Sequence, residues 1–408
     1  MKKVWDKWTE IALVKRILVG LILGAILGIA VPQATGIAIL GDVFVSALKA
    51  IAPLLVFFLV ISSLCNAGKS HGGVIKTVII LYMFSTVLAA VIAVFASMAF
   101  PVKMTLANAA TDTSAPQGIV EVLNNLLLNV VANPVSSLVN ANYVGILMWA
   151  VLLGLAFRAA DKMTKNVLAD VADGISVVVT WIINLAPFGI FGLVFNTVST
   201  NGLDIFTTYG KLLLLLVGCM LFIYFVTNPL LVYWCIRQNP YPLIFHCLKR
   251  SALTAFFTRS SAANIPVNMK VCEEMGLDRD TYSVTIPLGA TINMDGAAIT
   301  ITVMTMATAF TLGIHVDIPT AIILSLLAAL SACGASGVAG GSLLLIPMAC
   351  SLFGISDDIS MQVVAVGFII GVVQDSVETA LNSSSDLLLS ASAEFRQWRL
   401  EGKEIKFK

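Results

Sequence analysis

Charged side chains are scarce in this sequence. Only 12% of its 408 residues are Asp, Glu, Lys or Arg, and the formal net charge is +1. A soluble domain carries about 25% of such residues, so that class is excluded, and no nucleic-acid partner is expected from so even a charge balance. Hydrophobic residues make up 58% of the chain, and the mean hydropathy is +0.95. These values predict an all-α protein that crosses a lipid bilayer many times.

The sequence also lacks the spacings that mark metals, haem or nucleotides. Its seven cysteines form no CxxC or CxxH pair, and its three histidines show no ligand spacing. The glycine run at residues 334–341 precedes no Gly-Lys-Ser/Thr, so it does not resemble a phosphate loop. We therefore expect no cofactor and no enzyme. An intramembrane aspartyl protease built on Asp295 and Asp375 is a minor alternative, because the motifs around such a dyad are missing.

Uncharged runs recur at about 20 residues or more, which suits a hydrocarbon core of about 30 Å. Basic clusters place the loops that hold them on the cytoplasmic side; they lie at residues 2–16, 69–76, 158–165, 237–250, 270–279 and 396–408. Eight crossings then leave both termini in the cytoplasm, in a multi-pass protein of the cell inner membrane. The first apolar run is too long for a cleavable signal peptide.

Two segments read as hairpins rather than spans. Residues 237–279 are basic at both ends and hold two short apolar halves around "TRSS", which predicts a re-entrant hairpin from the cytoplasm. Residues 318–356 carry no charge, have acidic flanks and contain "SACGASGVAGGS", which predicts a second hairpin from outside. Small-residue helix packing is the alternative for that glycine run. A polar or broken span follows each hairpin, so the chain reads as two inverted repeats.

Carboxylates interrupt the last two spans. In "NMDG", Asp295 stands beside a glycine, where a broken helix presents oxygens to a cation such as sodium. The alternative is an aspartate bonded to backbone at a kink. Five polar residues of the eighth span fall within an arc of about 100° on a helix: Asp375, Glu378, Thr379, Asn382 and Asp386. Each carboxylate at the bilayer centre costs roughly 2.5–3.5 kcal/mol, so the stripe faces protein, water or a cation; a structural ion-pair network is the alternative.

Two further signals are weaker. "LYMFSTV" puts Tyr82, Ser85 and Thr86 at i, i+3 and i+4, which ordinary interhelical hydrogen bonding explains as well. Arg259 in "TRSS" stands next to the start of a half-helix, whose N–H groups favour a carboxylate ligand. The same arginine could instead neutralise a carboxylate of the eighth span, and both roles are compatible.

In combination these motifs resemble the dicarboxylate/amino-acid:cation symporter family, which has the glutamate-transporter fold. The resemblance covers nearly the whole chain and rests on "RSS", "PLGATINMDG", the glycine-rich second tip and the D…T..N…D pattern of the eighth span. It implies eight transmembrane helices, two re-entrant hairpins and a homotrimer. The implied scaffold spans about 12–68, 118–157 and 175–200, and the implied mobile transport domain about 75–102, 209–236 and 240–393.

The resemblance also implies the sites. The tip serines with Asn382 would hold a substrate α-carboxylate, and Asp375 its α-amino group. The implied substrate residues are Arg259, Ser260, Ser261, Val338, Gly340, Asp375, Glu378, Thr379 and Asn382. The implied sodium ligands, by side chain or carbonyl, are Tyr82, Ser85, Thr86, Gly289, Thr291, Asn293, Met294, Asp295, Ala332, Cys333, Ala335, Asn382 and Asp386.

Two departures from the family pattern narrow the substrate. Carriers of acidic amino acids have an arginine where this chain has Glu378, and a threonine where it has Ala297. An acidic substrate would therefore bring an unpaired buried charge. Within the family the chain is similar to the bacterial sodium-coupled serine/threonine branch, which implies symport of L-serine and L-threonine by alternating access. A sodium- or proton-coupled carrier of another neutral or dicarboxylic substrate, and an ion channel, remain alternatives.

Overall fold

The computed structural model describes residues 11, 13–66, 73–106, 128, 131–203, 205–333, 335 and 340–405. Every regular element within these ranges is helical. The α-helices are α2 Leu13–Ala30, α3 Ile39–Asn66, α4 Gly73–Ala99, α6 Pro134–Val139, α7 Tyr143–Ala156, α8 Lys162–Asn184, α9 Ala186–Asn201, α10 Ile205–Phe222, α11 Asn228–Ile236, α12 Tyr241–Cys247, α13 Leu253–Thr258, α14 Ser261–Glu274, α15 Arg279–Ile292, α16 Asp295–Thr311, α17 Ile318–Ala332, α18 Ile346–Ser351 and α19 Asp357–Leu400. Short 3-10 turns lie at Thr35–Ala38, Phe157–Ala159 and Gly341–Leu345, and π turns at Ile223–Thr227 and Leu248–Ala252.

Six of the described helical segments are long and apolar enough to cross a membrane: Thr35–Asn66, Gly73–Ala99, Lys162–Asn184, Ile205–Ile236, Arg279–Thr311 and Asp357–Leu400. Apolar helices are the expected form here, because a helix satisfies its backbone hydrogen bonds internally and needs no water. The prediction of an all-α polytopic membrane protein is confirmed. The number of eight crossings stays a prediction.

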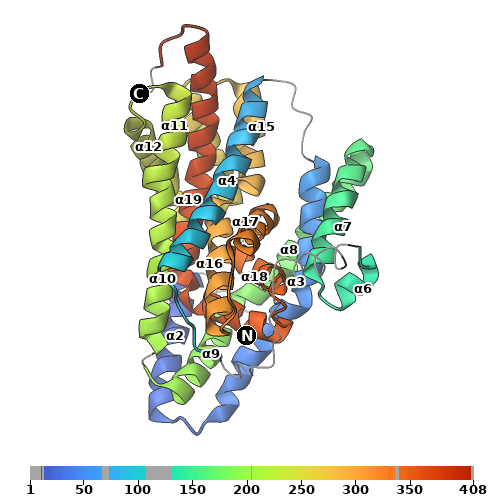
Figure 1. The fold of residues 1–408 in the computed structure, drawn as a ribbon, viewed down its shortest axis with the longest axis vertical. Helices are drawn as coiled ribbons and strands as arrows, with labels where there is room; N and C mark the ends of the chain where they lie inside the picture. The colour runs from blue at the N-terminus through green and yellow to red at the C-terminus, as the bar shows by residue number, and fades with distance from the viewer. Residues whose placement is uncertain are drawn as a thin grey trace.

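The helices pack in two groups. Helices α2, α3, α7, α8 and α9 contact one another, and α4 with α10–α19 forms the second group. Figure 1 shows α3, α6 and α7 on one side of the molecule and α4, α10, α11 and α19 on the other. The long helix α19 touches both groups, since it also contacts α2, α3 and α9.

Glycines allow α2 and α9 to approach closely. A Cβ added at Gly20 would lie 2.2 Å from the Pro187 carbonyl oxygen, and one at Gly24 would lie 2.6 Å from that of Phe191. Gly28 continues this face one turn later, 2.9 Å from the Phe195 carbonyl oxygen. Such a small-residue stripe is how membrane helices gain van der Waals contact when burial of apolar surface offers little advantage over lipid.

The fifth span differs from its expected form. The sequence predicted one segment over residues 175–200, whereas α8 begins at Lys162 and gives way to α9 at Leu185. Pro187 explains the division, because proline has no N–H to donate to the preceding turn. The early start reflects Asp161, whose side chain accepts a hydrogen bond from the Thr164 N–H (2.8 Å) and caps the helix. Hydrogen bonds from the backbone and the side chain of Thr164 lower the pKa of the Asp161 carboxyl.

Helix breaks occur at the places the motifs indicated. Helix α15 ends at Ile292, and α16 begins at Asp295 after two non-helical residues. Between α13 and α14 the chain turns at Arg259, whose φ of 53° is left-handed. The expected broken element at 122–157 appears as α6 and α7 in its described part, and its remaining residues lie outside the description.

Replacing Gly20 by alanine should weaken the α2–α9 contact. The new methyl group would overlap backbone that cannot rotate away, so we expect a loss of about 1–3 kcal/mol in the free energy of unfolding. Gly210→Ala in α10 is the matched control, because nothing lies within 4 Å of its added Cβ. Melting temperatures of the purified protein in detergent measure both. Equal melting temperatures for the two variants would contradict the close contact.

Candidate functional site

The polar stripe of α19 is buried inside the protein. None of its five residues is more than 6% exposed, and the helix contacts α13, α14, α15 and α16 around them. The stripe therefore faces other helices rather than lipid. This placement agrees with the cost of exposing carboxylates to hydrocarbon.

Asp375 joins two turns: the turn between α13 and α14, called the first tip here, and the turn at Gly340 before the Gly341–Leu345 helix, called the second tip. Its Oδ2 accepts a hydrogen bond from the Arg259 Nε–H (2.6 Å), and its Oδ1 accepts one from the Gly340 N–H (3.1 Å). Gly340 has a φ of 74°, which favours glycine at the turn that presents this N–H. Thr379, one helical turn along, donates its hydroxyl hydrogen to the Asp375 carbonyl oxygen (2.8 Å). One carboxylate thus holds Arg259 and Gly340 in fixed positions.

The tip serines start α14. Ser260 is its N-cap and accepts a hydrogen bond from the Ala263 N–H (3.2 Å), while Ser261 is buried at the first helical position. Arg259 precedes them and turns back to Asp375. Two roles were expected for Arg259, binding a carboxylate ligand and neutralising a carboxylate of the eighth span. The structure shows an ion pair between Arg259 and Asp375 of α19. Val338, expected to close over a substrate, lies outside the described residues.

Glu378 is surrounded by neutral donors. Its Oε2 accepts hydrogen bonds from the Thr300 hydroxyl (2.6 Å), the Ser342 hydroxyl (2.9 Å) and the Gln374 side-chain amide. A Cβ added at Gly296 would meet the Glu378 Cγ at 2.9 Å, so only glycine fits beside this side chain. The sequence did not reveal these three donors, because they come from α16, the turn before α18 and α19.

Asn382 and Asp386 face the break between α15 and α16. The Gly296 N–H donates to the Asn382 Oδ1 (2.7 Å), and the Asn382 amide contacts the Met294 sulfur at 3.4 Å. The Asn293 amide donates to the Asp386 Oδ1 (2.8 Å). Gly289 lies against the same carboxylate, since an added Cβ would be 2.8 Å from its Cγ. The break therefore gathers these expected ligands against α19.

Asp295 pairs with α4. Its two carboxylate oxygens accept hydrogen bonds from the Ser85 hydroxyl (2.7 Å) and the Thr86 hydroxyl (3.1 Å). The Met294 N–H donates to the Thr86 oxygen (3.3 Å). Tyr82 lies with Asp386 instead, donating its hydroxyl hydrogen to the Asp386 carbonyl oxygen (2.8 Å). The i, i+3, i+4 pattern of α4 thus serves two aspartates.

The remaining expected ligands lie around the ends of α15 and α17. Cys333 directs its thiol to the Ile292 carbonyl oxygen (3.7 Å), and the Ala335 N–H donates to the Ala332 carbonyl oxygen (2.9 Å). Thr291 is occupied locally by a hydrogen bond to the Leu288 carbonyl oxygen (2.7 Å). The end of α17 therefore lies next to the end of α15.

A cation at this site would be coordinated by one carboxylate together with hydroxyl, amide and carbonyl oxygens. Within the described ranges, no group of three or more His, Cys, Asp and Glu side chains is arranged to hold a metal ion. The Asn293 Oδ1 is buried and accepts no hydrogen bond from any described residue. This oxygen and the Asp386 carboxylate are hard ligands of the type that sodium takes.

A second buried network, which the sequence reading missed, supports the first tip. The Asn264 amide donates to the Ser251 hydroxyl oxygen (3.0 Å) and the Ser383 hydroxyl oxygen (2.8 Å). The Asn268 amide donates to the Ser383 carbonyl oxygen (2.8 Å), and the Ser251 hydroxyl donates to its Oδ1 (2.5 Å). Asn264 and Asn268 are four residues apart and share a helix face, which was the available signal.

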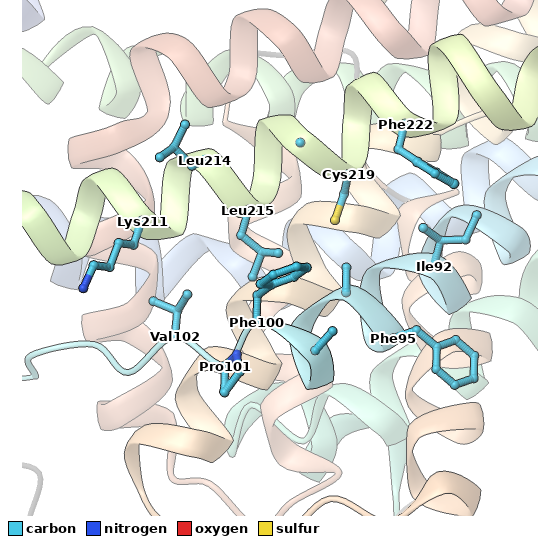
Figure 2. Close-up of a pocket in the computed structure, with 13 residues that line it drawn as sticks. Ile92, Phe95, Phe100, Pro101, Val102, Lys211, Leu214, Leu215, Cys219 and Phe222 are labelled. Atoms are coloured by element: carbon cyan, nitrogen blue, oxygen red, sulfur yellow. The ribbon is translucent and has the colours of Figure 1, made fainter.

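A separate cavity of about 870 Å³ lies between α4 and α10. Figure 2 shows its walls, where Phe100, Leu215 and Phe222 lie along the groove and Lys211 lies at one end. None of the stripe residues lines it, and its lining is almost wholly apolar. Apart from Lys211, the residues that line it offer no charged partner for the ends of an amino acid.

Comparison with known proteins decides the family. The model described as "Sodium:dicarboxylate symporter family" matches residues 13–394. The chain belongs to this family. Among similar family members, the Serine/threonine transporter SstT of Bifidobacterium adolescentis is 57% identical over 406 residues, which cover 99% of this chain and 94% of that protein. The Serine/threonine transporter SstT of Streptococcus thermophilus is 55% identical over 400 residues, covering 98% of this chain and all of that protein.

Asn268→Ala tests the network behind the first tip. It would remove the acceptor of the buried Ser251 hydroxyl hydrogen and the side-chain donor to the Ser383 carbonyl oxygen, so we expect about 2 kcal/mol less stability. The control is Asn66→Ala, an exposed side chain whose hydrogen bond among the described residues goes to the Ser62 carbonyl oxygen of its own helix. The two melting temperatures give the comparison. If the control loses as much stability, the network does not matter.

Proposed function

We propose that this protein is a sodium-coupled symporter that imports small neutral amino acids, L-serine and L-threonine. The observation that carries the substrate class is the charge pairing at the stripe. Arg259 is paired with Asp375, and the neighbouring Glu378 meets the hydroxyls of Thr300 and Ser342. The site has a carboxylate for a substrate ammonium, and no arginine left over for a second substrate carboxylate.

A dicarboxylate would be poorly accommodated there. Its extra negative charge would lie near Glu378 in a region from which water is excluded, and an unpaired buried charge is strongly destabilising. A hydroxyl group has no such cost, because it can both donate to and accept from neighbouring side chains. The names of the relatives, serine/threonine transporters, support the same substrates, although the family description mentions dicarboxylates.

The substrate's charged ends would take different partners. We assign the α-amino group of the substrate to Asp375. Once this ammonium replaces the Arg259 guanidinium at Asp375, Arg259 can shift toward the substrate α-carboxylate. The N-terminus of α14 with Ser260 and Ser261 favours that carboxylate through its N–H groups and dipole. Asn382 and Thr379 are the remaining contacts, and Val338 and Gly340 would close over the bound molecule.

Sodium is the coupled ion in this proposal. Asp386 with Asn293, Gly289 and Asn382 supplies one oxygen set, and Asp295 with Ser85 and Thr86 supplies another. A further set is made of carbonyl oxygens, those of Thr291, Ala332, Cys333 and Ala335 with Met294 adjacent. A sodium ion beside each aspartate would neutralise a charge that is otherwise costly to bury, so binding would order both the break and the second tip.

Alternating access would move one helix group against the other. We assign the group of α4 and α10–α19 to the mobile transport domain and the group of α2, α3 and α7–α9 to the scaffold, following their separate packing. The assembly is proposed to be a homotrimer in the cell inner membrane with both termini in the cytoplasm, on the basis of the family resemblance and the basic clusters.

Uptake into liposomes tests the proposal directly. Protein reconstituted with an inward sodium gradient should accumulate labelled serine, and unlabelled threonine should compete while aspartate should not. Saturation and accumulation against a gradient distinguish a symporter from an ion channel. Serine uptake that ignores the sodium gradient would refute sodium coupling.

Asp386→Asn should raise the sodium concentration that gives half-maximal uptake. Loss of one charged ligand costs about 1.5 kcal/mol or more, or roughly tenfold in affinity. Asp173→Asn on the exposed face of α8 makes the same chemical change away from the site and should behave as the unmodified protein. An unchanged sodium dependence in Asp386→Asn would remove this residue from the ion site.

Glu378→Arg should change the substrate. The new guanidinium would pair with the side-chain carboxylate of aspartate, so aspartate should begin to compete. It would also take up space in the serine site, so serine uptake should fall about tenfold or more. Glu378→Gln keeps the size and the hydrogen bonds, and should retain serine transport without admitting aspartate. Unchanged serine kinetics in the arginine variant would mean that Glu378 lies beyond the reach of the substrate.

A further inference from the structure

A polar cavity of about 400 Å³ lies where α19 ends, apart from the transport site. Its walls come from the start of α4, the start of α15, and the end of α19 with the segment that follows. The lining residues are Gly73, Val74, Asp278, Thr281, Glu394, Gln397, Trp398, Glu401 and Lys403. Three of these side chains are carboxylates and one is an amine, so the walls carry an excess of negative charge.

Glu394 is the buried member of this set. Only 4% of it is exposed, and its Oε1 accepts a hydrogen bond from the Asp278 N–H (2.6 Å). Its Oε2 is buried too and meets no donor in hydrogen-bond geometry among the described residues. A buried carboxylate oxygen without a donor is unfavourable by itself. It is an open acceptor in the wall of a cavity.

Three cations near the end of α19 already have partners. Lys403 pairs with Glu401 (2.7 Å), and the Arg399 Nε–H donates to the Cys235 carbonyl oxygen (3.1 Å). Arg396 lies over the Trp234 ring, 5.2 Å from its centre. Neither arginine lines the cavity. Lys403 lines the cavity and interacts electrostatically with Glu394, but it forms its ion pair with Glu401, so no described ion pair includes Glu394.

Asp278 is also engaged, which limits the kind of cation. Its side chain caps α15, accepting from the Asp280 N–H (3.3 Å) and the Thr281 hydroxyl (3.0 Å). A metal ion needs several converging ligands, and no such group of His, Cys, Asp and Glu occurs in the described parts of the chain. An ammonium group needs less, because its N–H donors can each take one acceptor.

We propose that this cavity binds a primary ammonium group, with Glu394 as its charged acceptor. Gln397 donates its amide to Glu401 (2.8 Å), which leaves its carbonyl oxygen as a second acceptor. Trp398 lines the same cavity, and an indole ring attracts a cation that lies over its face. Glu394 is eight residues beyond Asp386, about 12 Å along the helix, so this site is separate from the proposed transport site and does not depend on its function.

Binding of radiolabelled methylammonium to the full-length protein in nanodiscs tests the site. Saturating sodium and serine keep the transport site occupied, and ionic strength is held constant. We expect saturable binding that potassium and tetramethylammonium do not displace, because neither has N–H donors. Glu394→Gln should weaken it about tenfold or more, as expected for a lost charge-assisted hydrogen bond. Competition by ammonium chloride against 1,4-diaminobutane distinguishes an inorganic from an organic source of the group.

Three comparisons make the result decisive. Glu273→Gln removes an exposed carboxylate from α14 and should leave binding unchanged. Asp386→Asn should also retain binding, and loss there with retention in Glu394→Gln would mean that methylammonium occupies the sodium site, which overturns the proposal. Displacement by potassium as effective as by ammonium would overturn it too. If Glu394→Gln does not fold, Glu394→Asp keeps the charge on a shorter side chain, and undiminished affinity in that variant would count against Glu394.

Discussion

Each carboxylate that this protein buries must find a partner inside an apolar helical bundle. Four of them, Asp295, Asp375, Glu378 and Asp386, lie in the last two long segments and are 5% exposed or less. An ionised carboxylate removed from water without compensation is far too costly to persist. The surrounding helices and turns are arranged so that each of these four carboxylates receives hydrogen bonds.

Breaks in the helices supply some of the donors in this polar region. A continuous helix uses its own N–H groups, whereas the break at Asn293 and Met294 frees the Gly296 N–H for Asn382. The left-handed turns at Arg259 and Gly340 direct a guanidinium and an N–H toward Asp375. These three interruptions each place a donor against α19. A ligand can act through these hydrogen bonds. A sodium ion or an ammonium group that binds an α19 carboxylate would replace the donor from the neighbouring segment, and that segment would then be free to move.

The boundary between the two helix groups includes contacts of modest strength. Lys49 of α3 meets Asp358 (2.7 Å) and Asp357 (3.6 Å) at the start of α19, where the charges are partly exposed. Exposed ion pairs of this kind contribute roughly 0–1 kcal/mol. Phe44 and Phe368 add an edge-to-face ring contact, with centroids 5.2 Å apart. A transport mechanism that moves one group past the other requires contacts of this modest strength, and the glycine-lined α2–α9 contact lies within one group.

The sequence by itself determined the class of fold, the helix breaks at Arg259 and at Asn293–Met294, and the polar stripe, although it did not reveal the break between α8 and α9. Low charge, long apolar runs and 100° spacing are local properties, and they identified Asp295 and the α19 residues without coordinates. It could not identify Thr300 and Ser342 as partners of Glu378, or Asn264 and Asn268 as the support of the first tip, because those partners come from segments far apart in the chain. The tertiary structure also decided that Tyr82 lies with Asp386 while Ser85 and Thr86 lie with Asp295. The physical reason is that hydrogen bonds reach only about 3 Å, so pairing depends on how helices pack, and spacing along one helix cannot reveal it.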